Sequence, residues 1–297
     1  MLAFSAFSGG RVEVRARAKV NLGLEVLGRR ADGYHELRSV MWAIDLADRV
    51  TLEPGGDGIA LECAAPDVPR TPDNLAWRAA ELVRRETGAA TGLRIRIEKR
   101  IPVAAGLGGG SADAAAVRRR SVRCGRRRRR AASAGGHGGR RSGWTCPSSC
   151  GGARRWRGDA ERRSGRCRRA RDLSLVIANP GFPRDARRAT RGSSRPTTVT
   201  GVRSTRWSTA LRRGVDAVAA AVTNGLERAA ARLWPGLGRG QGGAASGAGC
   251  LAALMSGSGP TVFGIAPVAS GGAPDPRQRW RRGRGGSGSR ARSPARS

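Results

Sequence analysis

The stretch that most constrains the fold is residues 101–130, IPVAAGLGGGSADAAAVRRRSVRCGRRRRR. Its first half places glycines between an apolar segment and an alanine-rich segment, which is typical of a loop that opens a helix. Its second half is a run of arginines that no packed helix could bury, because an unpaired buried charge is very costly. The first half therefore predicts a packed helix at this place in the fold, whereas the second half predicts that such a helix cannot continue into the core.

Positive charge is concentrated in the second part of the chain. Residues 1–116 hold 16 Lys and Arg against 15 Asp and Glu, whereas the remaining 181 residues hold 40 basic and 7 acidic side chains. A net charge of +34 ordinarily points to nucleic acid or an anionic membrane surface. All 40 of those basic residues are Arg, although Lys neutralises a phosphate about as well. The bias therefore indicates codon composition rather than a binding surface.

The six cysteines form no CxxC pair, and no signal peptide precedes them. We interpret them as free thiols in a reducing cytoplasm. A metal site of His137, Cys146 and Cys150 is disfavoured by its poor spacing. No apolar run approaches the ~20 residues that a membrane span needs. The sequence therefore predicts a cytoplasmic protein with no metal-ligating cluster of its own, and it leaves the oligomeric state open.

The first part of the chain alternates between strand and helix patterns. Apolar and polar residues alternate, as in half-buried strands, over residues 11–28 and 93–103, and residues 34–52 are rich in β-type residues. Residues 73–87 place apolar side chains on one helical face, with Asp73 as the expected N-cap and Gly88 as the expected end. A second helix is expected from Ser111. This order predicts an α/β domain.

Beyond residue 116 the pattern is interrupted. No apolar period is visible over residues 117–172 or 184–213. A buried-strand pattern returns at 172–183, a helical pattern at 214–237, and a strand-like pattern at 250–266. The tail from residue 267 is rich in Gly, Arg and Ser, so we expect it to be disordered.

The segment Gly106–Ser111 has the composition of a phosphate-binding loop. Glycines let the backbone approach an anion, and the N–H groups at the start of a helix hold phosphate oxygens. Ser111 can cap that helix or contact the phosphate, and Asp113 is expected in its first turn, where a carboxylate suits the dipole. No Gly-Lys-Ser/Thr follows, and Ser111 replaces the last glycine of a dinucleotide fingerprint. A plain structural turn remains the alternative.

Six sequence blocks, which occur in one order, make the interpretation of this loop more specific. They are AKVNLGLEVLGRRADGYHEL (18–37), PDNLAWRAAEL (72–82), IPVAAGLGGGSADAAA (101–116), IANPGFP (177–183), NGLE (224–227) and MSGSGPTVFG (255–264). Together they resemble the GHMP-type small-molecule kinases, and within them most closely the 4-diphosphocytidyl-2-C-methyl-D-erythritol kinases of the non-mevalonate isoprenoid pathway. The resemblance is continuous over about 11–116 and patchy to 266.

The resemblance implies an α+β fold of two domains with the active site between them. Residues 1–172 would form an N-terminal β/α domain that carries the ATP loop. Residues 173–266 would form a ferredoxin-like C-terminal domain, and residues 267–297 a disordered tail. It also implies ATP-dependent phosphorylation of the 2-hydroxyl of 4-diphosphocytidyl-2-C-methyl-D-erythritol. ATP and Mg²⁺ would be the cofactors, because the metal neutralises phosphate charge.

Residue roles follow from the same resemblance. Lys19 would be the catalytic lysine, and Asn74 and Leu75 would border the adenine. The ATP phosphates would be cradled by Pro102, Val103, Ala104, Ala105, Gly106, Leu107, Gly108, Gly109, Gly110, Ser111 and Ala112. The substrate would be bound by Asn21, by Tyr34 and His35 at the cytosine, and by a second glycine loop of Gly257, Ser258 and Gly259. The alternative, if the motifs are set aside, is that Lys19 is a charged residue at the end of a strand and that the others are ordinary turn residues.

Kinases of this family carry a second catalytic residue, an Asp in an Ala-Asp-Val-Pro-Phe-Phe type segment, which accepts the hydroxyl proton. At about the expected distance this chain has GWTCPSSC, residues 143–150. A Trp codon is TGG and a Thr codon begins AC, so the last base of Trp144 and the first two of Thr145 spell GAC, an Asp codon. The neighbouring codons permit Val-Asp-Val-Pro-Phe-Phe-Leu. The partner Asp is therefore absent and expected near Thr145.

We interpret the arginine runs as a GC-rich gene translated out of frame. The frame is lost after about residue 116, returns near 172, slips after 183, returns by about 214, slips near 238–247 and is lost after 266. Loss of a general base typically costs about 10²–10⁴ in rate. If the chain is made as written, we expect the loop helix to end after barely two turns, and a partly folded, aggregation-prone product with negligible activity.

Two other functions stay open. A different GHMP-type kinase, acting on homoserine, mevalonate or galactose, is disfavoured by the Asp-Gly-Tyr-His segment, which matches the cytidine-binding edge of the preferred family. An Arg/Gly-rich nucleic-acid-binding protein would need aromatic residues between its basic ones for stacking. Residues 117–297 hold five Trp, two Phe and no Tyr without regular spacing. We therefore expect a small-molecule partner and no specific nucleic acid or membrane partner.

Overall fold

A computed structural model describes most of the kinase-like blocks of the chain. The described residues are 10–29, 35–87, 92–125, 155–158, 163–166, 173–180, 204–233, 249–267 and 281–282. Everything below refers to these ranges. None of the helices within them is long and apolar enough to span a membrane.

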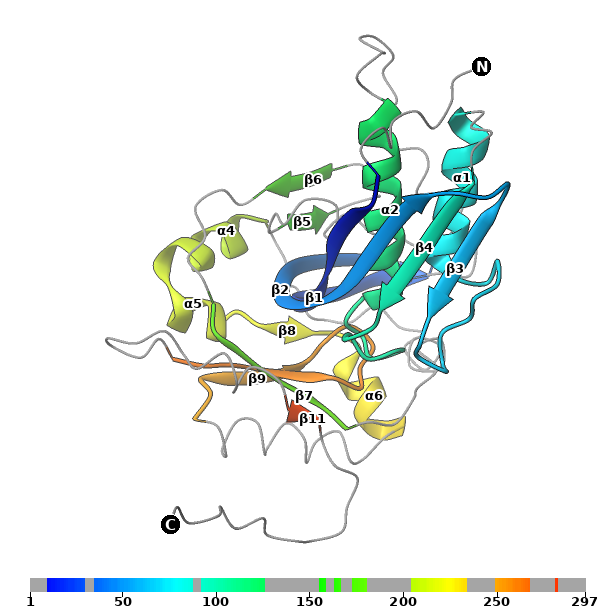
Figure 1. Ribbon diagram of the computed structural model, residues 1–297. Coiled ribbons are helices and arrows are strands. Elements are labelled where there is room, and N and C mark those ends of the chain that lie inside the picture. The colour runs from blue at the N-terminus through cyan, green and yellow to red at the C-terminus, as the bar shows by residue number, and fades with distance from the viewer. Residues whose placement is uncertain are drawn as a thin grey trace, which may run out of the picture.

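The described elements form two sheets with helices against them (Figure 1). The strands are β1 (Val12–Arg29), β2 (His35–Pro54), β3 (Ile59–Cys63), β4 (Leu93–Glu98), β5 (Arg155–Gly158), β6 (Arg163–Arg166), β7 (Leu175–Asn179), β8 (Thr223–Asn224), β9 (Ala252–Met255), β10 (Val262–Ile265) and β11 (Arg281–Arg282). The helices are α1 (Leu75–Thr87), α2 (Gly109–Gly125), α4 (Ser204–Arg213), α5 (Val215–Ala219) and α6 (Glu227–Leu233).

The first sheet is built around the long antiparallel pair β1 and β2, in the order β3-β4-β2-β1-β8. Strand β3 lies parallel to β4, and β8 lies parallel to β1. Register shifts interrupt the β1–β2 pairing between Arg17 and Lys19 and between Asn21 and Gly23. Such bulges bend a strand and re-aim its side chains. They flank the part of β1 that carries Lys19.

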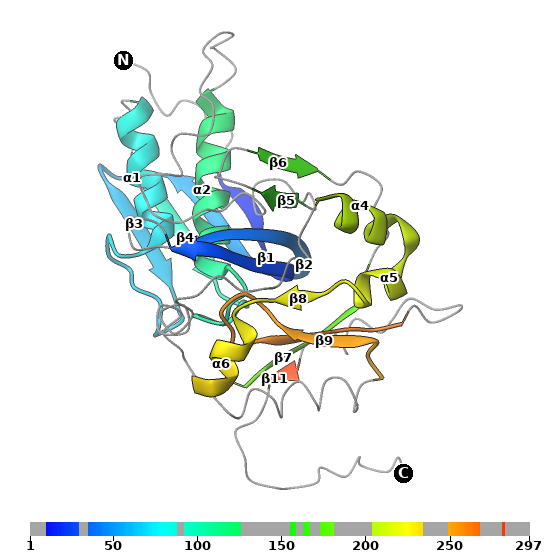
Figure 2. The same ribbon diagram turned by 180° about the vertical axis from the view of Figure 1, so that it is seen from behind.

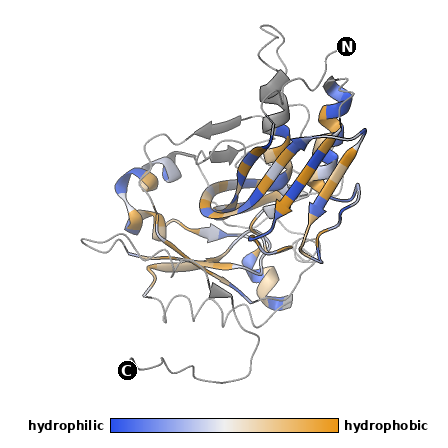
Figure 3. Ribbon diagram, in the orientation of Figure 1, coloured by the Kyte–Doolittle hydropathy of each residue, from blue (hydrophilic) through white to orange (hydrophobic). Residues whose placement is uncertain are grey.

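Helices α1 and α2 lie side by side on one face of the first sheet (Figures 1 and 2). Strand β4 presents Leu93, Ile95 and Ile97 to them and alternates with exposed residues, which confirms the predicted period (Figure 3). Leu52 and Val117 complete this core, and both are fully buried. Each such aliphatic side chain contributes about 1.5–3 kcal/mol to folding.

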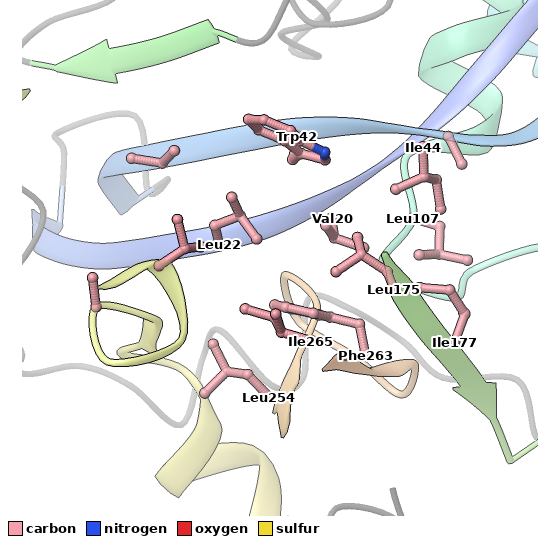
Figure 4. Close-up of a cluster of buried hydrophobic side chains, with 14 of the residues drawn as sticks. Val20, Leu22, Trp42, Ile44, Leu107, Leu175, Ile177, Leu254, Phe263 and Ile265 are labelled. Atoms are coloured by element: carbon pink, nitrogen blue, oxygen red, sulfur yellow. The ribbon is translucent and has the colours of Figure 1, made fainter. Parts of the chain in front are cut away.

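The second sheet has the order β11-β7-β10-β9 and packs against the first. Val20 and Leu22 of β1 face Ile177, Phe263 and Ile265 across one apolar cluster (Figure 4). These side chains are at most 3% exposed. The interval between the two sheets is therefore a continuous core, and loops at its edge are held in fixed positions.

The structure departs from several expectations in the first part of the chain. The N-cap of α1 is Asn74 rather than Asp73, because Asn74 Oδ1 accepts the Ala76 N–H at 2.9 Å. Helix α2 begins at Gly109 rather than Ser111 and runs to Gly125, well beyond two turns. Arg is a good helix former, and propagation of a formed helix is far easier than its nucleation.

The second part of the chain also differs from its expected form. Two short strands, β5 and β6, lie within 117–172, where the pattern predicted none, and β5 pairs with β2 through the backbone. The helix expected at 214–237 is two short helices separated by β8, because Thr223 and Asn224 pair with β1. Helix α4 forms within 184–213, and its Trp207 is 1% exposed. The two-residue β11 pairs with β7 in the tail expected to be disordered.

Candidate functional site

Lys19 and Asn21 project from β1 toward the two glycine loops. Alternate residues of a strand share a face, and the two side chains meet: Lys19 Nζ donates to Asn21 Oδ1 at 2.6 Å and to the Gly106 carbonyl at 2.5 Å. Asn21 Nδ2 donates to Ser39 Oγ, which donates to the Gly23 carbonyl. The amide of Asn21 is thereby oriented so that its oxygen faces the ammonium.

The predicted ATP loop leads directly into helix α2. Gly106 and Gly108 have φ of 74° and 71°, and Ala104 has φ of 52°, so the loop bends repeatedly through left-handed conformations. A Cβ on Gly108 would stand 3.2 Å from Lys19 Cε, so the lysine stem lies against the loop. In the first turn of α2 the N–H groups of Gly109, Gly110 and Ser111 have no carbonyl partner within the helix. Such a turn can hold phosphate oxygens.

The second glycine loop interlocks with the first. Ser256 Oγ donates to the Gly106 carbonyl at 3.1 Å, and a Cβ on Gly106 would lie 2.2 Å from the Ser256 carbonyl oxygen. A Cβ on Gly257 would lie 3.2 Å from Lys19 Nζ and 3.2 Å from Asn21 Oδ1. At Gly106 no Cβ can be accommodated, and at Gly257 the close contacts and a φ of 60° favour glycine. The ammonium of Lys19 is therefore enclosed by both loops.

A buried charge cluster of Lys99, Asp48 and Asp113 lies beneath the ATP loop. Lys99 Nζ donates to Asp48 Oδ2 at 2.5 Å and to Asp113 Oδ2 at 2.9 Å. Asp48 Oδ1 accepts the backbone N–H groups of Arg100 and Ile101, and Asp113 Oδ1 is buried without a hydrogen-bond partner among the described residues. The cluster ties α2 to β2 and to the residues after β4.

The electrostatics of this cluster follow from two carboxylates sharing one ammonium. Burial, together with the nearby charge of Asp48, raises the pKa of Asp113 to about 7, against the opposing charge of Lys99. Burial alone would lower the pKa of Lys99, but the charges of Asp113 and Asp48 raise it overall. Lys99 therefore stays charged, while Asp113 takes up a proton near neutral pH.

The structure describes some of the predicted site residues and leaves others outside its described ranges. Lys19, Asn21, the loop 102–112 and Gly257–Gly259 come together. Tyr34 and the region of Thr145 lie outside the described residues, and of His35 only the backbone at the start of β2 is described. Of the two residues expected to border the adenine, Leu75 lies near the start of α2: a Cβ on Gly110 would be 3.6 Å from Leu75 Cδ1.

Asp113 does not sit in the first turn of α2, where it was expected to suit the dipole. Helix α2 begins two residues earlier than expected, so no acidic residue lies in its first turn. The carboxylate of Asp113 is 3% exposed and instead faces Lys99.

Several residues of this site were not predicted. Asp48 and Lys99 are 51 positions apart, and Ser256 lies 150 positions from Gly106, so only the fold brings these pairs together. One signal was present in the sequence: Lys99 is one of only two lysines in a chain that otherwise uses arginine.

The described residues do not provide a metal site of their own. Among them, no group of three His, Cys, Asp or Glu side chains lies close enough to hold an ion. The acid nearest the phosphate loop, Asp113, is buried and paired with Lys99. A cation at this site would depend mainly on the phosphates of a bound nucleotide, as Mg²⁺ commonly does.

Comparisons with known proteins agree with this architecture. Residues 74–123 match the family described as "GHMP kinases N terminal domain". The chain is 39% identical over 265 residues to a 4-diphosphocytidyl-2-C-methyl-D-erythritol kinase of Symbiobacterium thermophilum, covering 86% of this chain and 91% of that protein. It is also 39% identical over 255 residues to one of Pelotomaculum thermopropionicum, covering 84% and 87%.

Solved structures give the same result. A crystal structure of 4-(cytidine 5'-diphospho)-2C-methyl-D-erythritol kinase matches with a TM-score of 0.62 and 32% identity, over 86% of this chain and 90% of that one. A homoserine kinase of Cytophaga hutchinsonii matches with a TM-score of 0.57 but only 16% identity, over 86% and 85%. The second likeness shows the shared fold alone.

Proposed function

This chain belongs to the 4-diphosphocytidyl-2-C-methyl-D-erythritol kinase family of the GHMP kinases, and from that premise we propose which of its residues serve the reaction. The family transfers a phosphoryl group from ATP to a small-molecule alcohol. We propose that the acceptor of this chain is 4-diphosphocytidyl-2-C-methyl-D-erythritol, at its 2-hydroxyl. The observation that carries the proposal is the ammonium of Lys19 held between two interlocked glycine loops.

Three groups of this chain would act on the phosphates. The N–H groups at the start of α2, around Gly109 and Ser111, would hold the β- and γ-phosphates. The Lys19 ammonium would stabilise the charge that develops on the transferring group. Mg²⁺, carried by the nucleotide, would supply further charge neutralisation when bound. The loop Gly257–Gly259 would close the opposite side, where the acceptor lies.

The reaction forms one bond and breaks one. The acceptor oxygen attacks the γ-phosphorus, the bond to the bridging oxygen of the β-phosphate breaks, and ADP leaves. The hydroxyl proton must pass to a base or to water. Residues 114–158 contain no Asp or Glu, so the family's carboxylate has no counterpart at its expected place near Thr145. Resequencing the coding DNA from codon 110 onward tests the frame interpretation: corrected shifts should restore an Asp codon there.

The acceptor assignment is tested by ADP formation over long incubation. The chain is supplied with ATP and, in separate reactions, with 4-diphosphocytidyl-2-C-methyl-D-erythritol, mevalonate or homoserine. We expect ADP and a phosphorylated product with the cytidine acceptor alone, at a low rate, and we expect the Lys19→Met variant to abolish it. Faster turnover of mevalonate or homoserine would overturn the acceptor assignment. Undiminished turnover by the Lys19→Met variant would overturn the role of the lysine.

A further inference from the structure

The segment NGLE, residues 224–227, has no role in the site as described so far, yet its two polar side chains hold the second glycine loop. Asn224 lies on β8, which pairs with β1 at Gly23 and Leu24, a short distance along the strand from Lys19. Glu227 begins α6. Both side chains point to the end of β9, where the chain enters the Gly257–Gly259 loop.

The hydrogen bonds of Asn224 use the whole amide. Its Nδ2 donates to the carbonyls of Met255 and Gly257, each at 2.8 Å, and its Oδ1 accepts the Leu226 N–H at 2.9 Å. Asn224 is 7% exposed. Two carbonyls require two N–H donors, which an amide supplies and a carboxylate does not. The side-chain type therefore matters as well as its size.

Glu227 provides the second side-chain hydrogen bond to the Met255 backbone. Its Oε1 accepts the Met255 N–H at 2.9 Å, so the backbone of Met255 is bonded through its N–H to Glu227 and through its carbonyl to Asn224. We name these two side chains the Asn224–Glu227 clasp. It fixes the last residue of β9 and, through the Gly257 carbonyl, the first residue of the glycine loop.

The clasp acts on the reactive side of the loop. Gly257 approaches Lys19 Nζ, Asn21 Oδ1 and the Gly106 carbonyl so closely that a Cβ there would be 3.2 Å from each. The latter two atoms are the acceptors that hold the ammonium. Any drift of Gly257 would therefore change the surroundings of Lys19.

We propose that Asn224 and Glu227 are positioning residues for phosphoryl transfer, which hold the Gly257–Gly259 loop against the Lys19 ammonium. The proposal rests on the proposed function for its catalytic meaning. Its physical content, the control of the Lys19 environment by two distant side chains, is measurable without turnover. Failure of the acceptor assay and failure of this proposal are therefore distinguishable.

The test uses the fact that Lys19 and Lys99 are the only lysines. The full chain labelled with ¹³C at lysine Cε gives two signals, which the Lys19→Arg and Lys99→Arg variants assign. Glu227→Met removes the acceptor for Met255 N–H, whereas Glu227→Gln keeps it. Asn224→Asp keeps the acceptor for Leu226 N–H but removes both donors.

We expect the Lys19 signal to move by more than its line width in Glu227→Met and in Asn224→Asp, with the Lys99 signal unchanged. In Glu227→Gln both signals should stay in place. An unmoved Lys19 signal in the first two variants would overturn the proposal. So would an equal movement in Glu227→Gln, or a joint movement or loss of both signals, because the side chains would then support the fold as a whole.

Discussion

Replacing Gly106 by alanine should separate the two glycine loops. The new Cβ would stand 2.2 Å from the Ser256 carbonyl oxygen and 2.9 Å from that of Gly259. Comfortable contact needs about 3.5 Å, so the loops would have to move apart by roughly 1 Å. Both oxygen atoms belong to the backbone, so no side-chain rotation can relieve the contact.

The cost of Gly106→Ala can be summed from three contributions. An alanine at φ of 74° is disfavoured by about 1–2 kcal/mol. Displacement of the Gly106 backbone loses the two bonds to its carbonyl, one from the Ser256 hydroxyl, worth about 1 kcal/mol, and one from the Lys19 ammonium, worth about 1.5–3 kcal/mol. We therefore expect the free energy of unfolding to fall by about 3.5–6 kcal/mol, and the affinity for an ATP analogue to fall with it.

The assay pairs urea unfolding with equilibrium binding of a non-hydrolysable ATP analogue. Gly58→Ala is the matched control, because nothing lies within 4 Å of its added Cβ and its φ is ordinary. That variant should stay within about 1 kcal/mol of the parent chain. If Gly106→Ala behaved like Gly58→Ala in both assays, the interlock of the loops would be refuted.

Three further predictions concern the cluster beneath the loop and the start of α1. Lys99→Met should lower the free energy of unfolding by about 3–5 kcal/mol, because it leaves the charge of Asp48 buried without its partner; urea titration measures this, and an unchanged midpoint would contradict it. Burial raises the pKa of Asp113 from 3.8 to about 7, so between these pH values the folded state binds a proton that the unfolded chain has released. The contribution of Asp113 to stability therefore falls as pH rises through that window and is constant above it. Asp113→Asn should remove a pH-dependent difference on the order of 4 kcal/mol between pH 4 and pH 8, and parallel profiles for the two chains would refute the assignment. Asn74→Ala should cost about 1–2 kcal/mol, since it removes both the acceptor for the Ala76 N–H and the donor to the Pro69 carbonyl; a thermal scan measures this, and an unchanged midpoint would contradict it.

Local sequence pattern predicts those parts of the site whose residues lie within one motif. Lys19 and Asn21 lie two apart on one strand, and Gly106 and Gly108 bend through left-handed conformations that few other residues adopt. The alternation at Leu93, Ile95 and Ile97 likewise follows from short-range chemistry. These elements formed as expected because each depends on neighbours in the sequence.

The remainder depends on contacts between distant parts of the chain. Asp48 could not be assigned, because its partners Lys99 to Ile101 follow more than 50 residues later. The two residues of β8 read as helix in isolation, but pairing with β1 and the side-chain bonds of Asn224 outweigh that local preference. Helix α2 continued into the arginine run because local propensity there favours a helix, whatever the origin of those codons.

We propose that this chain keeps the lysine of the kinase site, Lys19, and lacks the carboxylate expected near Thr145. It is tested most directly by the initial rate of ADP formation from ATP and 4-diphosphocytidyl-2-C-methyl-D-erythritol, with the Symbiobacterium thermophilum relative measured in parallel. We expect this chain to be slower by a factor of about 10²–10⁴, the usual cost of a missing general base. An equal rate in the two proteins would contradict it.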